Sequence, residues 1–167
     1  DGKILDKNNL RLWQKNISHV PQSIFLTDNS LTENIAFGEK KTDIRMTDIQ
    51  DSIRKASLTE FINSSNEGLN KNLGERGVEL SGGEKQRVGI ARAFYCKSEV
   101  IIFDEATSAL DEETENFILN SISELKKIST IIIISHKMST LKNCDKIIKI
   151  SNGKINKMGK YNEFVKV

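Results

Sequence analysis

The sequence predicts an α/β fold with a mainly parallel central sheet and a small α-helical subdomain. Two apolar runs rich in β-branched residues, 100–103 and 130–134, are separated by a stretch of good helix formers. Buried parallel strands connected by helices have this pattern. Between residues 39 and 73, polar loops alternate with helical patterns, including one face made of Ile49, Ile53 and Ala56. These residues indicate the helical subdomain.

Composition limits the size and class of the protein. The 167 residues are enough for one domain with a core and too few for two. With 29% charged residues and a net charge of +2, we expect no nucleic-acid partner. Cys96 and Cys144 lack CxxC spacing and are interpreted as reduced thiols that bind no metal. The longest apolar run, 131–134, is far below the roughly 20 residues of a membrane-spanning helix.

The first residues carry no targeting signal. The stretch DGKILDKNNL is polar and lacks an initiator methionine, so no signal peptide is indicated. We therefore expect the chain to begin within a longer protein or to have been trimmed.

The first third of the chain predicts one short helix. Ser30-x-x-Glu33 matches the capping box that opens a helix, and Gly38 lies near its expected end. Taken alone, Gln22 would be an ordinary polar residue after a strand-ending proline.

The sequence LSGGE at 80–84 predicts a helix entrance, with two interpretations. Ser81 and Glu84 match a second capping box, which needs no ligand. Alternatively, unpaired N–H groups, the positive end of the helix dipole and the small Gly82 and Gly83 would let a phosphate bind the backbone there. The local sequence leaves both interpretations open.

The run VIIF at 100–103 is followed by two carboxylates, Asp104 and Glu105. Open α/β sheets bind ligands at the carboxyl ends of their strands, so this edge is a candidate site. The alternative is that the acids only mark the solvated end of a strand.

The remainder of the chain predicts a helix, a strand, a hairpin and a final short helix. Asp111 is an N-cap candidate for a helix. Its expected core-facing residues are Phe117, Ile118, Ile122 and Leu125. We expect a buried strand at Thr130–Ile134, followed by Ser135 and His136, although a lone histidine there is more often structural. The hairpin is expected at Lys146–Ser151 and Lys154–Met158 around Asn152-Gly153, and the last helix at Lys160–Val167.

In their order and spacing, these motifs resemble the ATP-binding-cassette (ABC) ATPases. LSGGEKQR resembles the family signature, VIIFDE its Walker B strand and SALD its D-loop. ISHVPQ resembles the strand that leads into the Q-loop, which implies a strand at Ile17–Val20 that ends at Pro21–Gln22. The stretches ENIAFG and GERG resemble the exporter branch of the family. The resemblance implies a P-loop NTPase-like fold. Its core would comprise residues 1–22 and 98–167, and its helical subdomain with the signature about residues 23–97.

The resemblance implies ATP and Mg²⁺ as cofactors and assigns roles to individual residues. Asp104 and Gln22 would bind Mg²⁺, Glu105 would act as general base on the attacking water, and His136 would donate to the γ-phosphate. The nucleotide-binding residues would be Gln22, Ser81, Gly82, Gly83, Glu84 and Asp111. Gln22 would also report to the membrane partner.

The resemblance also implies partners and a location. In this family the signature faces the P-loop of a second nucleotide-binding domain, so a homodimer or heterodimer would form each ATP site. Coupling helices of a transmembrane domain would bind near residues 23–38, at the cytoplasmic face of a membrane.

Three rival functions follow: an exporter ATPase, which we favour, a soluble ABC ATPase of DNA maintenance or translation, and a catalytically silent interaction domain. The second would predict heptad arms or basic surfaces, and neither is visible.

Two departures from the family pattern have consequences. The phosphate-binding motif G-x-x-x-x-G-K-[ST] does not occur in these residues, nor do the first strands of the family's sheet. We therefore expect these 167 residues alone to bind ATP poorly and not to hydrolyse it. Glu84 stands where the signature usually has glutamine, which places an acid near the expected γ-phosphate.

Overall fold

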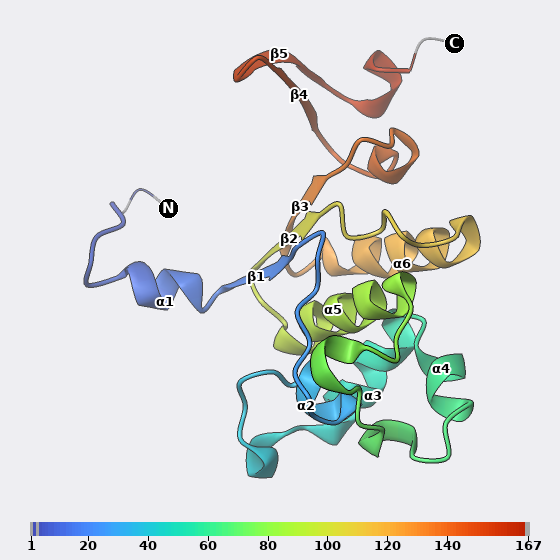
Figure 1. The fold of residues 1–167 in the computed structure, drawn as a ribbon. Coiled ribbons are helices and arrows are strands. Elements are labelled where there is room, and N and C mark those ends of the chain that lie inside the picture. Colours follow the sequence, from blue (N-terminus) through green and yellow to red (C-terminus); the bar gives the residue numbers. More distant parts are fainter. Residues whose placement is uncertain (1, 3, 166–167) are drawn as a thin grey trace. The chain divides into compact units, whose positions relative to one another are not determined.

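The computed structural model describes residue 2 and residues 4–165, which form two compact units (Figure 1). The first unit is Asp1–Ile134 and the second is Ser135–Val167. The predicted boundaries between the core and the helical subdomain, after residues 22 and 97, stay a prediction.

The first unit contains a parallel three-stranded sheet in the order β1-β2-β3. The strands are β1 (Ile17–Val20), β2 (Val100–Asp104) and β3 (Thr130–Ile134), and both neighbouring pairs are parallel. In this register Val20 lies opposite Phe103, and Asp104 lies opposite Ile134. The predicted α/β class and parallel pairing are confirmed. The carboxyl ends of the three strands therefore share one edge of the sheet.

β3 is less buried than its sequence predicts. Its side chains alternate between half-buried and exposed, and Ile132 and Ile134 are 45% and 48% exposed. The prediction of a buried strand is wrong because successive side chains point to opposite faces of the sheet, and among the described residues only Ile131 and Ile133 of this strand pack against the core. The central strand β2 instead buries Ile101 and Phe103.

One helix begins within the signature, and another follows the Walker B strand. α5 (Gly82–Cys96) and α6 (Glu112–Leu125) contribute Ile90, Ile118 and Ile122 to the buried core. Phe117, predicted to face the core, is 44% exposed. The prediction was wrong because the buried residues of α6 recur at spacings of three and four, and Phe117 lies about 100° from its neighbour Ile118 around the helix.

The helical part of the first unit packs against α5. α2 (Leu31–Ile35) and α3 (Met46–Lys55) both contact α5, and α4 (Thr59–Asn63) follows α3 (Figure 1). Ile49, Ile53 and Ala56 are buried as predicted. The remaining short elements of this unit are α1 (Leu10–Gln14) and the 3-10 turns η1 (Lys41–Asp43), η2 (Gly68–Asn70) and η3 (Glu75–Gly77). No helix within residues 4–165 is long and apolar enough to cross a membrane.

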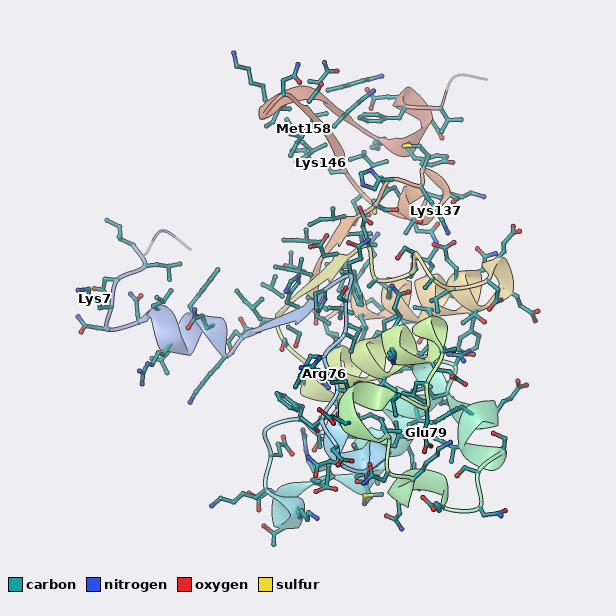
Figure 2. The ribbon with its side chains drawn as sticks, in the orientation of Figure 1. Lys7, Arg76, Glu79, Lys137, Lys146 and Met158 are labelled. Carbon is teal, nitrogen blue, oxygen red and sulfur yellow. The ribbon has the colours of Figure 1, made fainter. Side chains whose placement is uncertain are left out.

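The second unit contains the predicted hairpin. β4 (Ile147–Ser151) and β5 (Lys154–Gly159) pair antiparallel, and Lys146 and Met158 mark this part of the chain in Figure 2. The turn residues Asn152 and Gly153 have φ values of 50° and 71°, as a type I′ turn requires. The other elements are η4 (Ser139–Leu141) and η5 (Tyr161–Glu163). The predicted last helix is reduced to η5, and its final two residues lie outside the described residues.

Candidate functional site

The site begins where β1 and β2 end. Gln22 follows β1 and Glu105 follows β2, and the Nε2 of Gln22 donates a hydrogen bond to Oε2 of Glu105 at 3.0 Å. These residues are 83 positions apart in sequence. They meet because parallel strands in register place their carboxyl ends at the same edge. An amide and a carboxylate, two groups suited to positioning a water molecule, therefore share this edge.

Glu105 has a backbone conformation that is unusual for a residue with a side chain. Its φ is 50°, in the left-handed region, which costs about 1–2 kcal/mol for a residue other than glycine. Its N–H donates to the carbonyl oxygen of Ile134 at 3.0 Å, and its carbonyl oxygen accepts from the N–H of Ser108 at 3.1 Å. These two hydrogen bonds hold the left-handed turn at Glu105, where the strand ends.

Asp104 is the last residue of β2, and its side chain is 41% exposed. A single accessible carboxylate suits Mg²⁺, which usually takes one or two protein carboxylates and fills its other positions with phosphate and water. The carbonyl oxygen Oε1 is the amide atom of Gln22 that can coordinate a metal, and its Nε2 donates to Glu105. The donor chemistry of Asp104 and Gln22 therefore fits the predicted magnesium site. Residues 4–165 contain no group of three or more His, Cys, Asp or Glu side chains that could hold a metal ion.

His19 is a neighbour of Asp104 that the sequence analysis did not single out. Its Nε2 lies 3.8 Å from Oδ2 of Asp104, and its side chain is 50% exposed. No local sequence signal could have found this pair, because it depends on β1 and β2 lying side by side in one particular register.

The entrance of α5 has the geometry that its sequence predicts. The Ser81 hydroxyl accepts from the N–H of Glu84 at 3.2 Å, and the Glu84 carboxylate accepts from the N–H of Ser81 at 2.7 Å. The capping box is thus formed, and one oxygen of Glu84 is occupied by it. Arg76 and Glu79 lie on the segment that leads into this helix (Figure 2).

Gly83 allows the helix entrance to lie against the D-loop. A Cβ at this position would lie 3.1 Å from the carbonyl oxygen of Ala109 and 3.5 Å from Cδ2 of Leu110. Ser81 and Gly82 are exposed and Gly83 is half-buried. Because the first-turn N–H groups of a helix have no partner inside it, the entrance can bind an anion.

Asp111 caps the next helix, as predicted. Its Oδ1 accepts from the N–H of Thr114 at 2.9 Å. This backbone hydrogen bond lowers the pKa of the Asp111 carboxyl below its ordinary value, and the positive charge of Arg87 adds a smaller contribution. Asp111 is exposed, so it is accessible to another molecule.

Gln86 connects α5 to the D-loop, a contact that the sequence analysis did not predict. This residue is 4% exposed and lies in α5 one turn beyond the glycines. Its side-chain Nε2 is 3.1 Å from the hydroxyl of Ser108, and its Oε1 accepts from the N–H of Ala109 at 3.0 Å. A sequence signal did exist, because Gln86 shares the spacing of the buried Ile90 and Ala93 and is therefore a polar residue on an apolar stripe.

His136 belongs to the second unit. It follows β3 directly in the chain and lies in the short irregular stretch where the N–H of Lys137 donates to the Ser135 hydroxyl at 3.0 Å. Its approach to the groups of the first unit stays a prediction.

Comparisons with known proteins agree with this fold. The family model of the ABC transporters matches residues 1–108, and the chain belongs to this family. Family membership implies ATP binding. The chain is 38% identical over 165 residues to an ATP-dependent lipid A-core flippase of Francisella tularensis (strain SCHU S4), covering 99% of this chain and 26% of the relative. A lipid A-core flippase of Colwellia psychrerythraea is 40% identical over 166 residues, covering 96% of this chain and 27% of the relative.

A solved structure of a bacterial Atm1-family ABC exporter with ATP bound is also similar. The TM-score is 0.85 at 33% identity, and the match covers 90% of this chain and 26% of the other. The fold is therefore that of the ATPase domain of an ABC exporter or flippase. The chain spans about a quarter of the length of the relatives that it matches.

Proposed function

We propose that this chain is part of an ATPase domain that hydrolyses ATP to drive export of a substrate across a membrane. The observation that carries the proposal is the hydrogen bond of 3.0 Å between Gln22 and Glu105 at the edge of the sheet where β2 ends with Asp104. Similarity to flippases and to an ATP-bound exporter supports the transport role.

The residues at this edge suit phosphoryl transfer to water. Bound Mg²⁺ would neutralise charge on the phosphates of ATP, which supply the transferred group. Glu105 would take the proton of the attacking water, and its hydrogen bond to Gln22 would keep the carboxylate oriented toward that water. Asp104 would hold the ion, and His136 would donate to the γ-phosphate.

We propose further that two nucleotide-binding domains share each ATP site. Ser81, Gly82 and Asp111 are exposed, so a second domain can reach the entrance of α5 and the D-loop. In this arrangement the helix entrance would bind the γ-phosphate of the partner's ATP. Glu84 is held in the capping box, so the phosphate contact there would come from backbone N–H groups and the Ser81 hydroxyl.

The surface between residues 23 and 38 supports a transmembrane partner. Phe25 and Phe37 are 61% and 50% exposed there. Arg92 holds this surface: its Nε donates to the carbonyl oxygen of Asn34 at 2.9 Å, and its guanidinium lies 4.7 Å from the centre of the Phe37 ring. Because Arg92 holds a loop that presents two exposed aromatic side chains, the surface suits the apolar end of a helix from a membrane domain. The ATPase domain would then lie at the cytoplasmic face of the membrane.

ATPase measurements on the intact parent protein in proteoliposomes test the proposal. Glu105→Gln should lower kcat by on the order of 100-fold or more, because it removes the general base and changes little else. The matched control is Glu60→Gln, the same change at an exposed position of α4. Wild-type kcat in Glu105→Gln would refute the role of Glu105.

The isolated 167 residues provide a second test. We expect them to show no ATP hydrolysis, because they contain no lysine-bearing phosphate loop. A measurable rate that Glu105→Gln abolishes would contradict this expectation.

A further inference from the structure

Gln86 is a buried amide whose two ends are both hydrogen-bonded. It is 4% exposed and lies on the face of α5 that carries Ile90 and Ala93 into the core. Burial of an amide is favourable only when its donors and acceptor find partners. The partners of this side chain are therefore the reason a polar group is tolerated at this position.

The partners all lie on loops of the candidate site. The Oε1 of Gln86 accepts from the N–H of Ala109 at 3.0 Å, and its Nε2 lies 3.1 Å from the Ser108 hydroxyl. The same Nε2 makes two longer contacts of 3.5 Å, to the carbonyl oxygens of Gln22 and Glu105. One side chain thus links the signature helix to the ends of β1 and β2 and to the D-loop.

These contacts bear on the direction in which Glu105 points. The left-handed turn at Glu105 has a φ of 50° and persists only when its surroundings hold it. Its carbonyl oxygen accepts from the N–H of Ser108 at 3.1 Å and also contacts Gln86. A change of this left-handed conformation would change the direction in which the Glu105 side chain leaves the backbone.

We propose that Gln86 is a positioning residue for hydrolysis: its amide holds the Glu105 turn and the D-loop against α5 in the orientation that the reaction needs. This inference rests on the proposed role of Glu105 as general base. It also means that a displacement of the signature helix reaches both Gln22 and Glu105 through one side chain.

The test compares steady-state ATP hydrolysis by variants of the intact parent protein. Gln86→Met keeps an unbranched side chain of similar volume and removes every hydrogen bond. We expect kcat to fall roughly 10- to 100-fold, because small misplacements of catalytic groups have effects of this size, with KM for ATP within about 2-fold of wild type. Gln50→Met is the matched control, since Gln50 is exposed on α3.

A second variant separates positioning from folding. Gln86→Glu keeps an acceptor for the Ala109 N–H but removes the donor that contacts the Gln22 and Glu105 carbonyl oxygens, so the same loss of kcat is expected. Wild-type kcat in either variant would overturn the proposal. So would a loss of kcat that disappears at a lower assay temperature, since only global instability would then be at work.

The outcome for Glu105→Gln distinguishes this inference from the proposed function. If Glu105→Gln abolishes hydrolysis and Gln86→Met does not reduce it, only the positioning role is refuted. If wild-type hydrolysis is insensitive to Glu105→Gln, the proposed function itself is refuted, and this inference with it.

Discussion

Gly89, in the middle of α5, provides a sharp test of the packing between this helix and the chain after β1. A Cβ at position 89 would lie 2.4 Å from Cδ1, 2.8 Å from Cγ1 and 3.2 Å from Cγ2 of Ile24. Rotation of the end of the Ile24 side chain can move Cδ1, but Cγ1 and Cγ2 are attached to the stiff β-branch. Gly89→Ala therefore forces the helix or the segment around Ile24 to shift.

Two opposing terms set the size of the effect. Alanine in a helix interior is favoured over glycine by about 0.5–1 kcal/mol, whereas overpacking a core costs about 1–3 kcal/mol. Gly89→Ala should therefore lower the free energy of unfolding by about 0–2.5 kcal/mol. In an Ile24→Ala background all three close atoms are absent, so the same change should raise the free energy of unfolding by about 0.5–1 kcal/mol.

Urea unfolding of the four proteins in this cycle, followed by circular dichroism, measures both effects. The coupling free energy between positions 24 and 89 should be about 1–3 kcal/mol. If Gly89→Ala stabilises the protein equally in both backgrounds, the close approach of α5 and Ile24 is refuted.

Three further predictions concern helix ends and charge. Ser30→Ala removes the acceptor for the N–H of Glu33 and should lower the free energy of unfolding by about 0.5–2 kcal/mol in urea titrations, whereas an unchanged midpoint would refute the capping box of α2. The Nζ of Lys97 donates a hydrogen bond to the Asp48 carboxylate at 2.7 Å, which lowers the pKa of that carboxyl. The ionised Asp48 therefore stabilises the folded protein above the ordinary aspartate pKa of about 3.9, and this stabilisation is lost as pH falls through the lowered pKa. Unfolding midpoints of Asp48→Asn should consequently fall less steeply below about pH 4 than those of wild type, and equal slopes would contradict this. Arg92→Lys should lower the thermal midpoint, because lysine cannot contact the carbonyl oxygens of Phe25 and Asn34 together and stack on Phe37; an unchanged midpoint would show that the planar guanidinium is dispensable.

Much of the local structure follows from short-range signals in the chain. The capping boxes at Ser30 and Ser81 form as their S-x-x-E patterns predict, and the Asn152-Gly153 turn closes the expected hairpin. The strand Thr130–Ile134 has the bounds predicted from its apolar run. These features depend on residues within a few positions of one another, so a single sequence contains the information. The bounds of the strand Ile17–Val20 are also confirmed, but they were implied by the family resemblance.

The errors lie where the helical phase or the neighbours of a strand decide the outcome. Phe117 is exposed because the buried face of α6 is centred on Ile118 and Ile122. Ile132 and Ile134 are exposed because they lie on the face of β3 opposite to Ile131 and Ile133, which pack against the core. An apolar side chain looks the same in the sequence in either situation.

The sequence by itself therefore determined the family resemblance, the order of strands and helices, and the residue types of the candidate site. Only the tertiary structure decided that Gln22 reaches Glu105, that His19 lies beside Asp104 and that Gln86 contacts both the D-loop and the strand ends. The physical reason is that these contacts join residues 19 to 85 positions apart, and their existence depends on the register of β1 against β2 and on the rotation of α5 about its axis.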